Sequence, residues 1–195
     1  MSGIAGIAAV ILLGVTALTL FLSQDWRVSV AALAVQYAGV AVLVGMSWPV
    51  ALAVVKVVVG WMAAAALGLT QIGQPFGMEE RSWPGGRIFR SVAASLVLLV
   101  ILTISPGVSA WFPGVRNVQV IGGLILIGMG LLHLGMTARP LRVILGLLTV
   151  LSGFEIFYAV VETSVLVAGL LVVVTLGLAL VGAYLLTATV EGEQA

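Results

Sequence analysis

The sequence predicts an all-α fold, a polytopic membrane helix bundle of seven transmembrane helices with its N-terminus outside and its C-terminus inside. Hydrophobic residues make up 62% of the 195-residue chain and the mean hydropathy is +1.29, whereas soluble domains are about 45–50% apolar. Apolar runs close to the roughly 20 residues that cross a bilayer core recur along the whole chain. The arginines between these runs are distributed unevenly, which predicts the orientation.

Short polar turns separate the apolar runs and set the expected helix bounds. The seven predicted helices are Ile4–Leu22, Val28–Met46, Val50–Thr70, Ser91 to about Ile104, Val118–Met136, Leu141–Val161 and Ser164–Thr187. The first has no basic n-region and no small-residue cleavage site, so we expect it to be retained rather than removed as a signal peptide. Two prolines and four glycines between Gln71 and Arg90 argue against a continuous helix there. Pro106-Gly107 predicts a stop or a kink in the fourth helix, and a continuation of the helix to Phe112 is the alternative.

Positive charge orients the bundle, because cytoplasmic loops carry an excess of arginine and lysine. Numbering the connections alternately places only Arg116 on one side and six arginines on the other, namely Arg27, Arg81, Arg87, Arg90, Arg139 and Arg142. We count Lys56 as intramembrane. The side with six arginines is therefore predicted to face inward, in the inner (plasma) membrane of the cell.

Composition also excludes several kinds of chemistry. The formal net charge of +1 gives no reason to expect nucleic-acid binding, and the absence of cysteine excludes disulfides, thiolate metal sites and iron–sulfur ligation. The chain has no phosphate-binding loop and no nucleophile paired with a base. We therefore expect no catalytic centre, cofactor or metal in this chain, which leaves an accessory subunit of an oxidoreductase complex open.

One carboxylate, Glu155, lies inside the apolar run Leu141–Val161, about 9 Å from its outer end at 1.5 Å per residue. Charged residues at membrane depth are rare, usually paired, and mark ion or proton paths. Glu155 is thus either a proton carrier or a structural acid that hydrogen-bonds a neighbouring helix. Tyr158 and Glu162 follow at i+3 and i+7 on the same helical face, which predicts a short polar track to the outer surface, unless Glu162 is simply hydrated.

Lys56 is a second intramembrane charge, six residues into the third predicted helix and also about 9 Å from the outer end. Opposite charges at matching depth suggest that Lys56 pairs with Glu155. Two alternatives stay open. The lysine stem could reach the outer interface, or Lys56 could face a partner chain.

The remaining polar and aromatic residues are weaker signals. His133, near the inner end of the fifth helix, is either a packed histidine or a proton relay. Gln36 and Tyr37 are expected to hydrogen-bond between helices. The glycines of the fifth helix allow close helix packing. Aromatic residues at predicted boundaries are typical of interface anchors: Trp26, Trp48, Trp83, Trp111 and Phe112.

Short motifs in the last three helices resemble the three-helix K subunit of respiratory complex I (NuoK) and the C-type subunit of multisubunit cation/proton antiporters. Leu151–Ile156, with the sequence LSGFEI, is similar to the L-I-G-L-E-type motif that carries a membrane glutamate in that family. Thr175–Leu180 is similar to a stretch of the K subunit's last helix. With four further helices in front, and Lys56 in an early one, the chain resembles the E-type (HyfE-like) membrane subunit of group 4 hydrogenases.

This resemblance implies a division into a four-helix part, residues 1–116, and a three-helix NuoK-like part, residues 117–195. It also implies a non-catalytic subunit that helps carry protons or cations through Glu155, beside antiporter-like large subunits. Val173 stands where the K subunit has a second buried glutamate. Either Glu162 substitutes for that acid, or a partner supplies it, or the subunit only anchors the complex. Two other functions stay open, namely a structural membrane anchor without its own ion path and a stand-alone small transporter.

Overall fold

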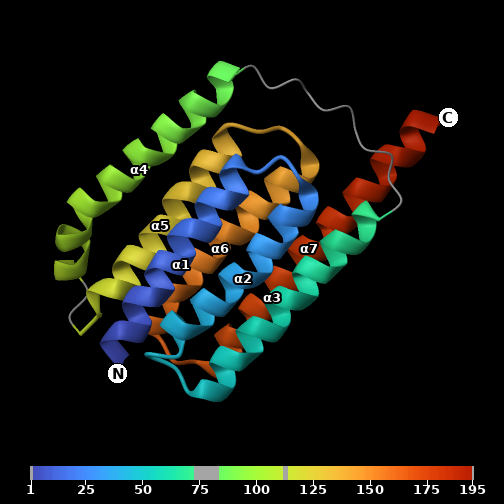
Figure 1. Cartoon of the computed structure of the whole chain (residues 1–195). Helices are drawn as coiled ribbons and strands as arrows, with labels where there is room; N and C mark the ends of the chain where they lie inside the picture. Colours follow the sequence, from blue (N-terminus) through green and yellow to red (C-terminus); the bar gives the residue numbers. More distant parts are fainter. Residues whose placement is uncertain (1, 73–83, 112–113, 195) are drawn as a thin grey trace.

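The computed structural model describes residues 2–72, 84–111 and 114–194 as seven α-helices joined by turns (Figure 1). In chain order the helices are α1 (Ser2–Leu22), α2 (Trp26–Val44), α3 (Val50–Gln71), α4 (Pro84–Trp111), α5 (Asn117–Gly135), α6 (Pro140–Val161) and α7 (Val165–Gln194). Within the described residues, all seven are long and apolar enough to cross a membrane, and no strand is present. The predicted all-α fold with seven helices of membrane-spanning length is confirmed.

Six of the helices form two rows that pack face to face. The first row is α1, α2 and α3, and the second is α5, α6 and α7. Each helix of one row contacts its counterpart in the other, α1 with α5, α2 with α6 and α3 with α7. Helices α2, α3, α7 and α6 therefore enclose one shared core.

The N-terminus and the C-terminus lie at opposite ends of the bundle (Figure 1). We call these the N end, which holds the α2–α3 and α6–α7 turns, and the C end, which holds the α1–α2 and α5–α6 turns. At the C end, the Asp25 carboxylate accepts a hydrogen bond from the backbone N–H of Arg27 and caps α2. Arg142 donates to the carbonyl of Ser23 across that same end.

Close backbone approach between α5 and α6 depends on glycine, as expected from the glycine-rich fifth helix. A Cβ atom on Gly153 would lie 2.7 Å from the carbonyl oxygen of Gly123, and one on Gly130 would lie 2.6 Å from a Val150 methyl. Any larger residue at either position would push the two helices apart.

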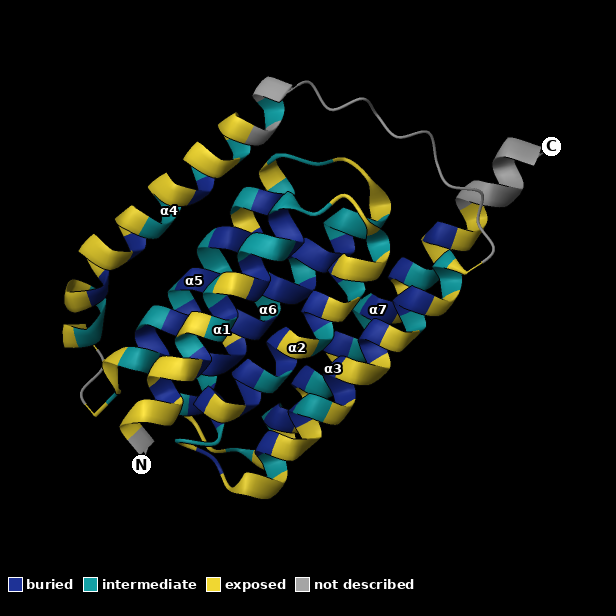
Figure 2. Ribbon diagram, in the orientation of Figure 1, coloured by how far each residue is buried: buried dark blue, intermediate teal, exposed yellow. Residues whose placement is uncertain are grey.

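Helix α4 packs mainly on α5 and lines the outside of the two rows. Ala94 and Ile101 face the bundle and are buried, whereas Leu96 and Leu99 are each 62% exposed. Figure 2 shows exposed residues along the outer side of α4, and from Ile88 to Trp111 most of the large ones are apolar. Such a surface suits contact with lipid, which is consistent with a membrane location.

The ends of two helices, α4 and α7, differ most from the expected bounds. Helix α4 begins at Pro84, inside the segment expected to be non-helical, because proline is tolerated in the first turn of a helix. It also continues through Pro106 to Trp111, so of the alternatives for Pro106 the stop is wrong and a continuation towards Phe112 agrees with the described part of the helix. Helix α7 extends through the acidic tail to Gln194 rather than ending at Thr187. The expected positions of Arg81, Trp83 and Phe112 lie outside the described residues.

Candidate polar site in the bundle core

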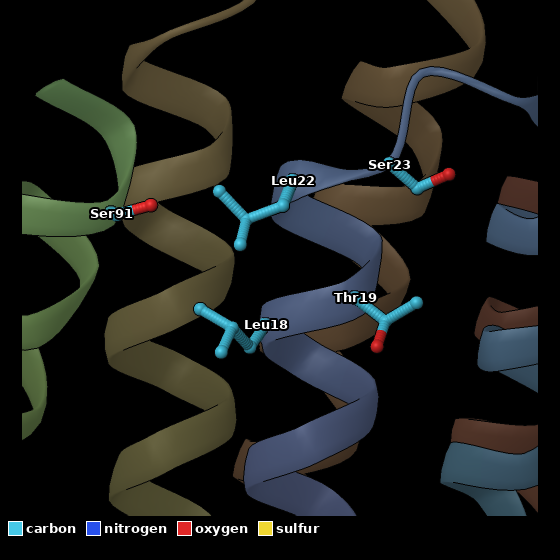
Figure 3. Close-up of a pocket in the computed structure, with 5 residues that line it drawn as sticks. All are labelled: Leu18, Thr19, Leu22, Ser23 and Ser91. Carbon is cyan, nitrogen blue, oxygen red and sulfur yellow. The ribbon is translucent and has the colours of Figure 1, made fainter. Parts of the chain in front are cut away.

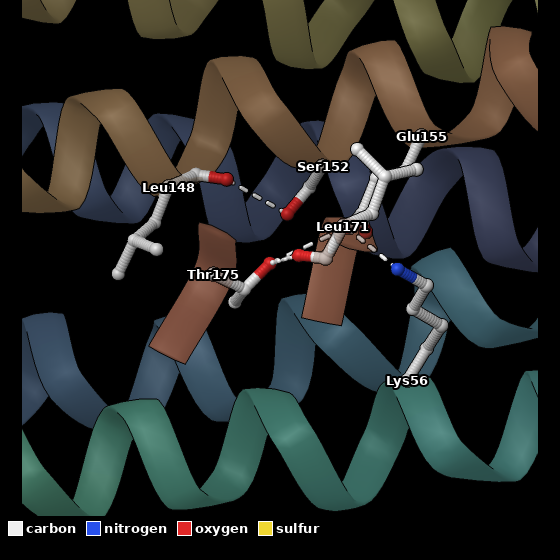
Figure 4. A network of polar contacts seen from close by, with 6 residues as sticks. All are labelled: Lys56, Leu148, Ser152, Glu155, Leu171 and Thr175. Carbon is white, nitrogen blue, oxygen red and sulfur yellow. Dashed lines mark hydrogen bonds and ion pairs between the residues drawn. The ribbon is translucent and has the colours of Figure 1, made fainter. Parts of the chain in front are cut away.

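The buried ion pair of Lys56 and Glu155 is the main polar contact between the two rows. The Lys56 Nζ atom lies 2.6 Å from Glu155 Oε1, and the side chains are 2% and 1% exposed. Figure 4 shows Lys56 reaching from α3 towards the carboxylate on α6. Pairing is thus the alternative that the structure supports. The 1% exposure of Lys56 as a whole excludes a lysine that extends to the interface.

Helix α7 adds a hydroxyl to this pair. Thr175 Oγ1 lies 3.3 Å from Glu155 Oε1 and 2.8 Å from the carbonyl oxygen of Leu171 (Figure 4). The hydroxyl has a single proton, so it can donate to one of these oxygens at a time and accept through its lone pairs. Glu155 Oε2 is buried and has no hydrogen-bond partner. Three helices thus meet at one carboxylate that keeps an unused oxygen.

A row of hydroxyl groups continues from Glu155 along α6. Ser152 and Thr149 precede the glutamate by three and six residues, so they lie about 4.5 and 9 Å further towards the C end. Both are buried and donate to the carbonyl four residues earlier, at 2.8 Å. Gln36 of α2 donates to Thr149 Oγ1 at 3.4 Å, and its own Oε1 has no partner.

Tyr37 places a further hydroxyl in this cluster from α2. The side chain is 1% exposed, and its hydroxyl is buried without a hydrogen-bond partner. The ring lies against Gly60 of α3, where an added Cβ would stand 2.0 Å from the Tyr37 Cγ atom. A glycine is therefore required at residue 60 for the ring to enter the core.

We define the core polar cluster as Glu155 and the buried polar side chains that lie beside it or follow it towards the C end, so that its members are Gln36, Tyr37, Lys56, Thr149, Ser152, Glu155 and Thr175. They come from the four helices that enclose the shared core. Towards the C end the cluster is followed by an apolar layer that includes Leu33, Leu67 and Leu145, each at most 1% exposed. The cluster therefore spans only part of the bundle.

Tyr158 and Glu162, which were expected to form a polar track from Glu155 to the outer surface, lie outside the core polar cluster. Glu162 is exposed at the end of α6, and its carboxylate accepts from the backbone N–H of Thr163. The Tyr158 ring is half-buried and packs edge-on against Trp48, with 6.3 Å between ring centroids. Among the described residues, no hydrogen bond joins Tyr158 or Glu162 to Glu155.

Trp48 has a packing role rather than the expected role of interface anchor. It is 3% exposed, and its indole N–H donates to the Glu162 carbonyl at 2.9 Å. This bond ties the α2–α3 turn to the α6–α7 turn at the N end. Trp111, in contrast, is 81% exposed, as an anchor should be.

His133 lies far from the ion pair, in the last turn of α5 at the C end. It is 3% exposed, packs edge-on against Phe21, and has no partner for Nε2. Arg90 and Arg142 lie within electrostatic range of the ring. Of the two alternatives for His133, a packed histidine or a proton relay, this position agrees with the packed histidine. The structure does not bring His133 to Glu155.

A separate groove of about 450 Å³ opens between α1 and α4. Leu18, Thr19 and Leu22 line it from α1, Ser23 lines it directly after that helix, and Ser91 faces them from α4 (Figure 3). None of the described residues that line this groove is charged, and the groove lies at the opposite end from the ion pair. Among the residues described, no three His, Asp or Glu side chains gather in a way that could hold a metal ion.

Thr175 and Ser152 were missed as site residues, although the sequence contained a signal for one of them. Thr149, Ser152 and Glu155 recur at intervals of three, which places them on one face of a helix. Val173, at the position of the K subunit's second glutamate, is 65% exposed and faces away from the core. On α7 the group that contacts Glu155 is therefore Thr175.

Comparison with protein-family models, with curated proteins and with solved structures finds no match to this chain.

Proposed function

We propose that this protein is a non-catalytic membrane subunit of an energy-converting complex and that Glu155 takes part in proton translocation. The observation that carries the proposal is the Lys56–Glu155 ion pair, 2.6 Å long and almost fully buried inside an apolar bundle. Charges at this depth are costly and are found chiefly where they serve transport. The free Oε2 of Glu155 leaves a position for an incoming proton.

The ion pair can act as a switch because its two partners compensate each other's charge. A proton that binds to Glu155 removes the negative charge and leaves Lys56 without a counter-ion in a medium of low dielectric constant. An uncompensated buried charge is strongly unfavourable. Lys56 must then lose its proton or find another acceptor, so protonation of one group drives a change at the other.

Partners are part of this proposal. The core polar cluster ends at Leu33 and Leu145, so a complete path requires groups from other chains. The LSGFEI motif resembles that of the K subunit, which supports partners of the antiporter-like or hydrogenase-like class. The arginines Arg27, Arg90, Arg139 and Arg142 all belong to the C end, which supports a C end that faces inward across the plasma membrane.

The proposal is tested by Glu155→Gln in the purified complex, with Glu162→Gln as the matched control. We expect Glu155→Gln to keep the redox reaction and to lose coupled proton movement, whereas Glu162→Gln keeps both, because Glu162 is exposed outside the cluster. Undiminished proton movement in Glu155→Gln overturns the proposal.

A structural anchor is the second candidate, and the closed packing around the pair favours it. All seven members of the core polar cluster are at most 3% exposed, so the pair could simply lock α3 to α6. An anchor predicts that Glu155→Gln lowers the amount of assembled complex without changing the protons moved per electron. Quantifying assembled complex and proton movement on the same preparation separates the two functions.

A further inference from the structure

The groove between α1 and α4 lies outside the core polar cluster, and the proposed function gives it no role. Its volume of about 450 Å³ is within the range of small-molecule sites, which runs from about 300 to 1,000 Å³. Figure 3 shows Leu18 and Leu22 pointing from α1 towards α4, where Ser91 points back at them. Ser23 adds a second hydroxyl directly after α1. The groove therefore combines an apolar wall with a polar edge.

The polar edge lies at the boundary of the apolar spans, and the apolar wall lies deeper. The apolar span of α1 ends at Leu22 and that of α4 begins at Ile88, so Ser23 and Ser91 are close to this boundary. Leu18 is four residues before Leu22 and lies about 6 Å further into the bundle. A lipid in the groove would therefore place an acyl chain against leucine and its headgroup beside the hydroxyls.

Two arginines flank the polar edge of the groove. Arg142, near the start of α6, donates a hydrogen bond to the carbonyl of Ser23. Arg90 directly precedes Ser91, and it lies four residues before the fully buried Ala94, so it is on the bundle side of α4. Both arginine side chains are half-buried. The mouth of the groove is therefore cationic.

We propose that this groove binds an anionic phospholipid. One acyl chain lies along Leu18 and Leu22, and the phosphate is bound by Arg90 and Arg142. The arginine guanidinium suits phosphate because its N–H groups form a rigid fork, and basic pockets between transmembrane helices bind anionic headgroups. Asp25, the nearest acid in the sequence, caps α2 with its carboxylate, so the charge at the mouth favours an anionic headgroup over a zwitterionic one. The site requires no proton movement and so goes beyond the proposed function.

The test measures the affinity of the first bound lipid by native mass spectrometry of the full chain in a neutral detergent. Phosphatidylglycerol and phosphatidylcholine are titrated separately. We expect the first phosphatidylglycerol to bind about tenfold or more tightly than the first phosphatidylcholine, since each arginine at an anionic headgroup contributes about fivefold. Arg90→Gln should weaken the first phosphatidylglycerol by about fivefold. Arg27→Gln is the control and should change this affinity by less than about twofold, because Arg27 is exposed and lies over the Trp26 ring outside the groove.

Two phenylalanine variants test the groove itself and keep the test decisive if Arg90→Gln does not fold. Ser91→Phe places a ring in the groove and should abolish the tight first site. Val92→Phe adds the same ring at the next residue, whose side chain is 59% exposed, and should leave the affinity unchanged. A calorimetric titration with inorganic phosphate alone separates a lipid site from a free-anion site, and we expect no binding of phosphate.

Three results would overturn the lipid site. The first is equal affinity of the wild type for phosphatidylglycerol and phosphatidylcholine, and the second is an unchanged phosphatidylglycerol affinity in both Arg90→Gln and Ser91→Phe. The third is binding of inorganic phosphate as tight as that of the lipid. A dimer that dissociates in Ser91→Phe would also overturn it and assign the groove to a second copy of this chain. Each of these failures leaves the role of Glu155 standing, because the groove lies at the opposite end of the bundle from the ion pair.

Discussion

The ion pair between Lys56 and Glu155 should contribute little net stability, yet removing either partner alone should destabilise the protein strongly. At 2.6 Å and an effective dielectric constant of about 20, Coulomb attraction amounts to about 6 kcal/mol. Desolvation of each ion costs several kcal/mol, so the two effects nearly cancel. Lys56→Met or Glu155→Leu alone leaves a buried charge without a partner, which costs about 3–5 kcal/mol.

The double variant should therefore be much more stable than the two single variants suggest. With both charges replaced by apolar side chains of similar volume, we expect a free energy of unfolding within about 2 kcal/mol of the wild type. The coupling energy from the double-mutant cycle should then exceed about 3 kcal/mol.

The assay is reversible unfolding of the purified chain in bicelles at neutral pH, applied to all four forms of the cycle. Effects of the two substitutions that add within about 0.5 kcal/mol would refute the reasoning, because additivity indicates residues that do not interact.

Two further predictions concern packing and orientation. Gly60→Ala should lower the free energy of unfolding by about 1–3 kcal/mol, because its Cβ would overlap the Tyr37 ring. Gly177→Ala is the control and should be neutral or slightly stabilising, because a Cβ added at Gly177 has no neighbouring atom within 4 Å. Equal effects of the two substitutions would contradict this packing. Since the chain has no cysteine, single Ala138→Cys and Thr163→Cys variants can report orientation. A membrane-impermeant thiol reagent should label Thr163→Cys only from outside and Ala138→Cys only from inside, and the reverse pattern would overturn the predicted topology.

The helices and the ion pair were predictable because their signals are local or simple. Each spanning helix shows in an apolar run, and the matching depths of Lys56 and Glu155 follow from counting residues at a fixed rise. Helix bounds were less predictable where proline is involved. Pro84 and Pro106 lie within α4, since the penalty of a proline depends on its place in the helix and on neighbouring contacts.

The rest of the core polar cluster could not be found from the sequence, because its membership depends on which sides of the helices pack against each other. Tyr37 and Thr175 are 138 residues apart, and only the packing of α2, α6 and α7 around one core places both side chains inside it. Trp48 also required the fold, because its partner is a backbone carbonyl 114 residues away. The division at residues 116 and 117 falls between α4 and α5 and stays a prediction.

The central claim is that Glu155 works through its exchangeable proton rather than through its shape. Glu155→Gln keeps the shape and a hydrogen-bonding side chain but cannot titrate, whereas Glu155→Asp keeps the titrating carboxyl on a shorter stem. The decisive measurement is the number of protons moved per electron by the purified complex in liposomes carrying each variant. We predict that Glu155→Asp retains a measurable fraction of the wild-type ratio and that Glu155→Gln retains none; a wild-type ratio in Glu155→Gln would contradict the account.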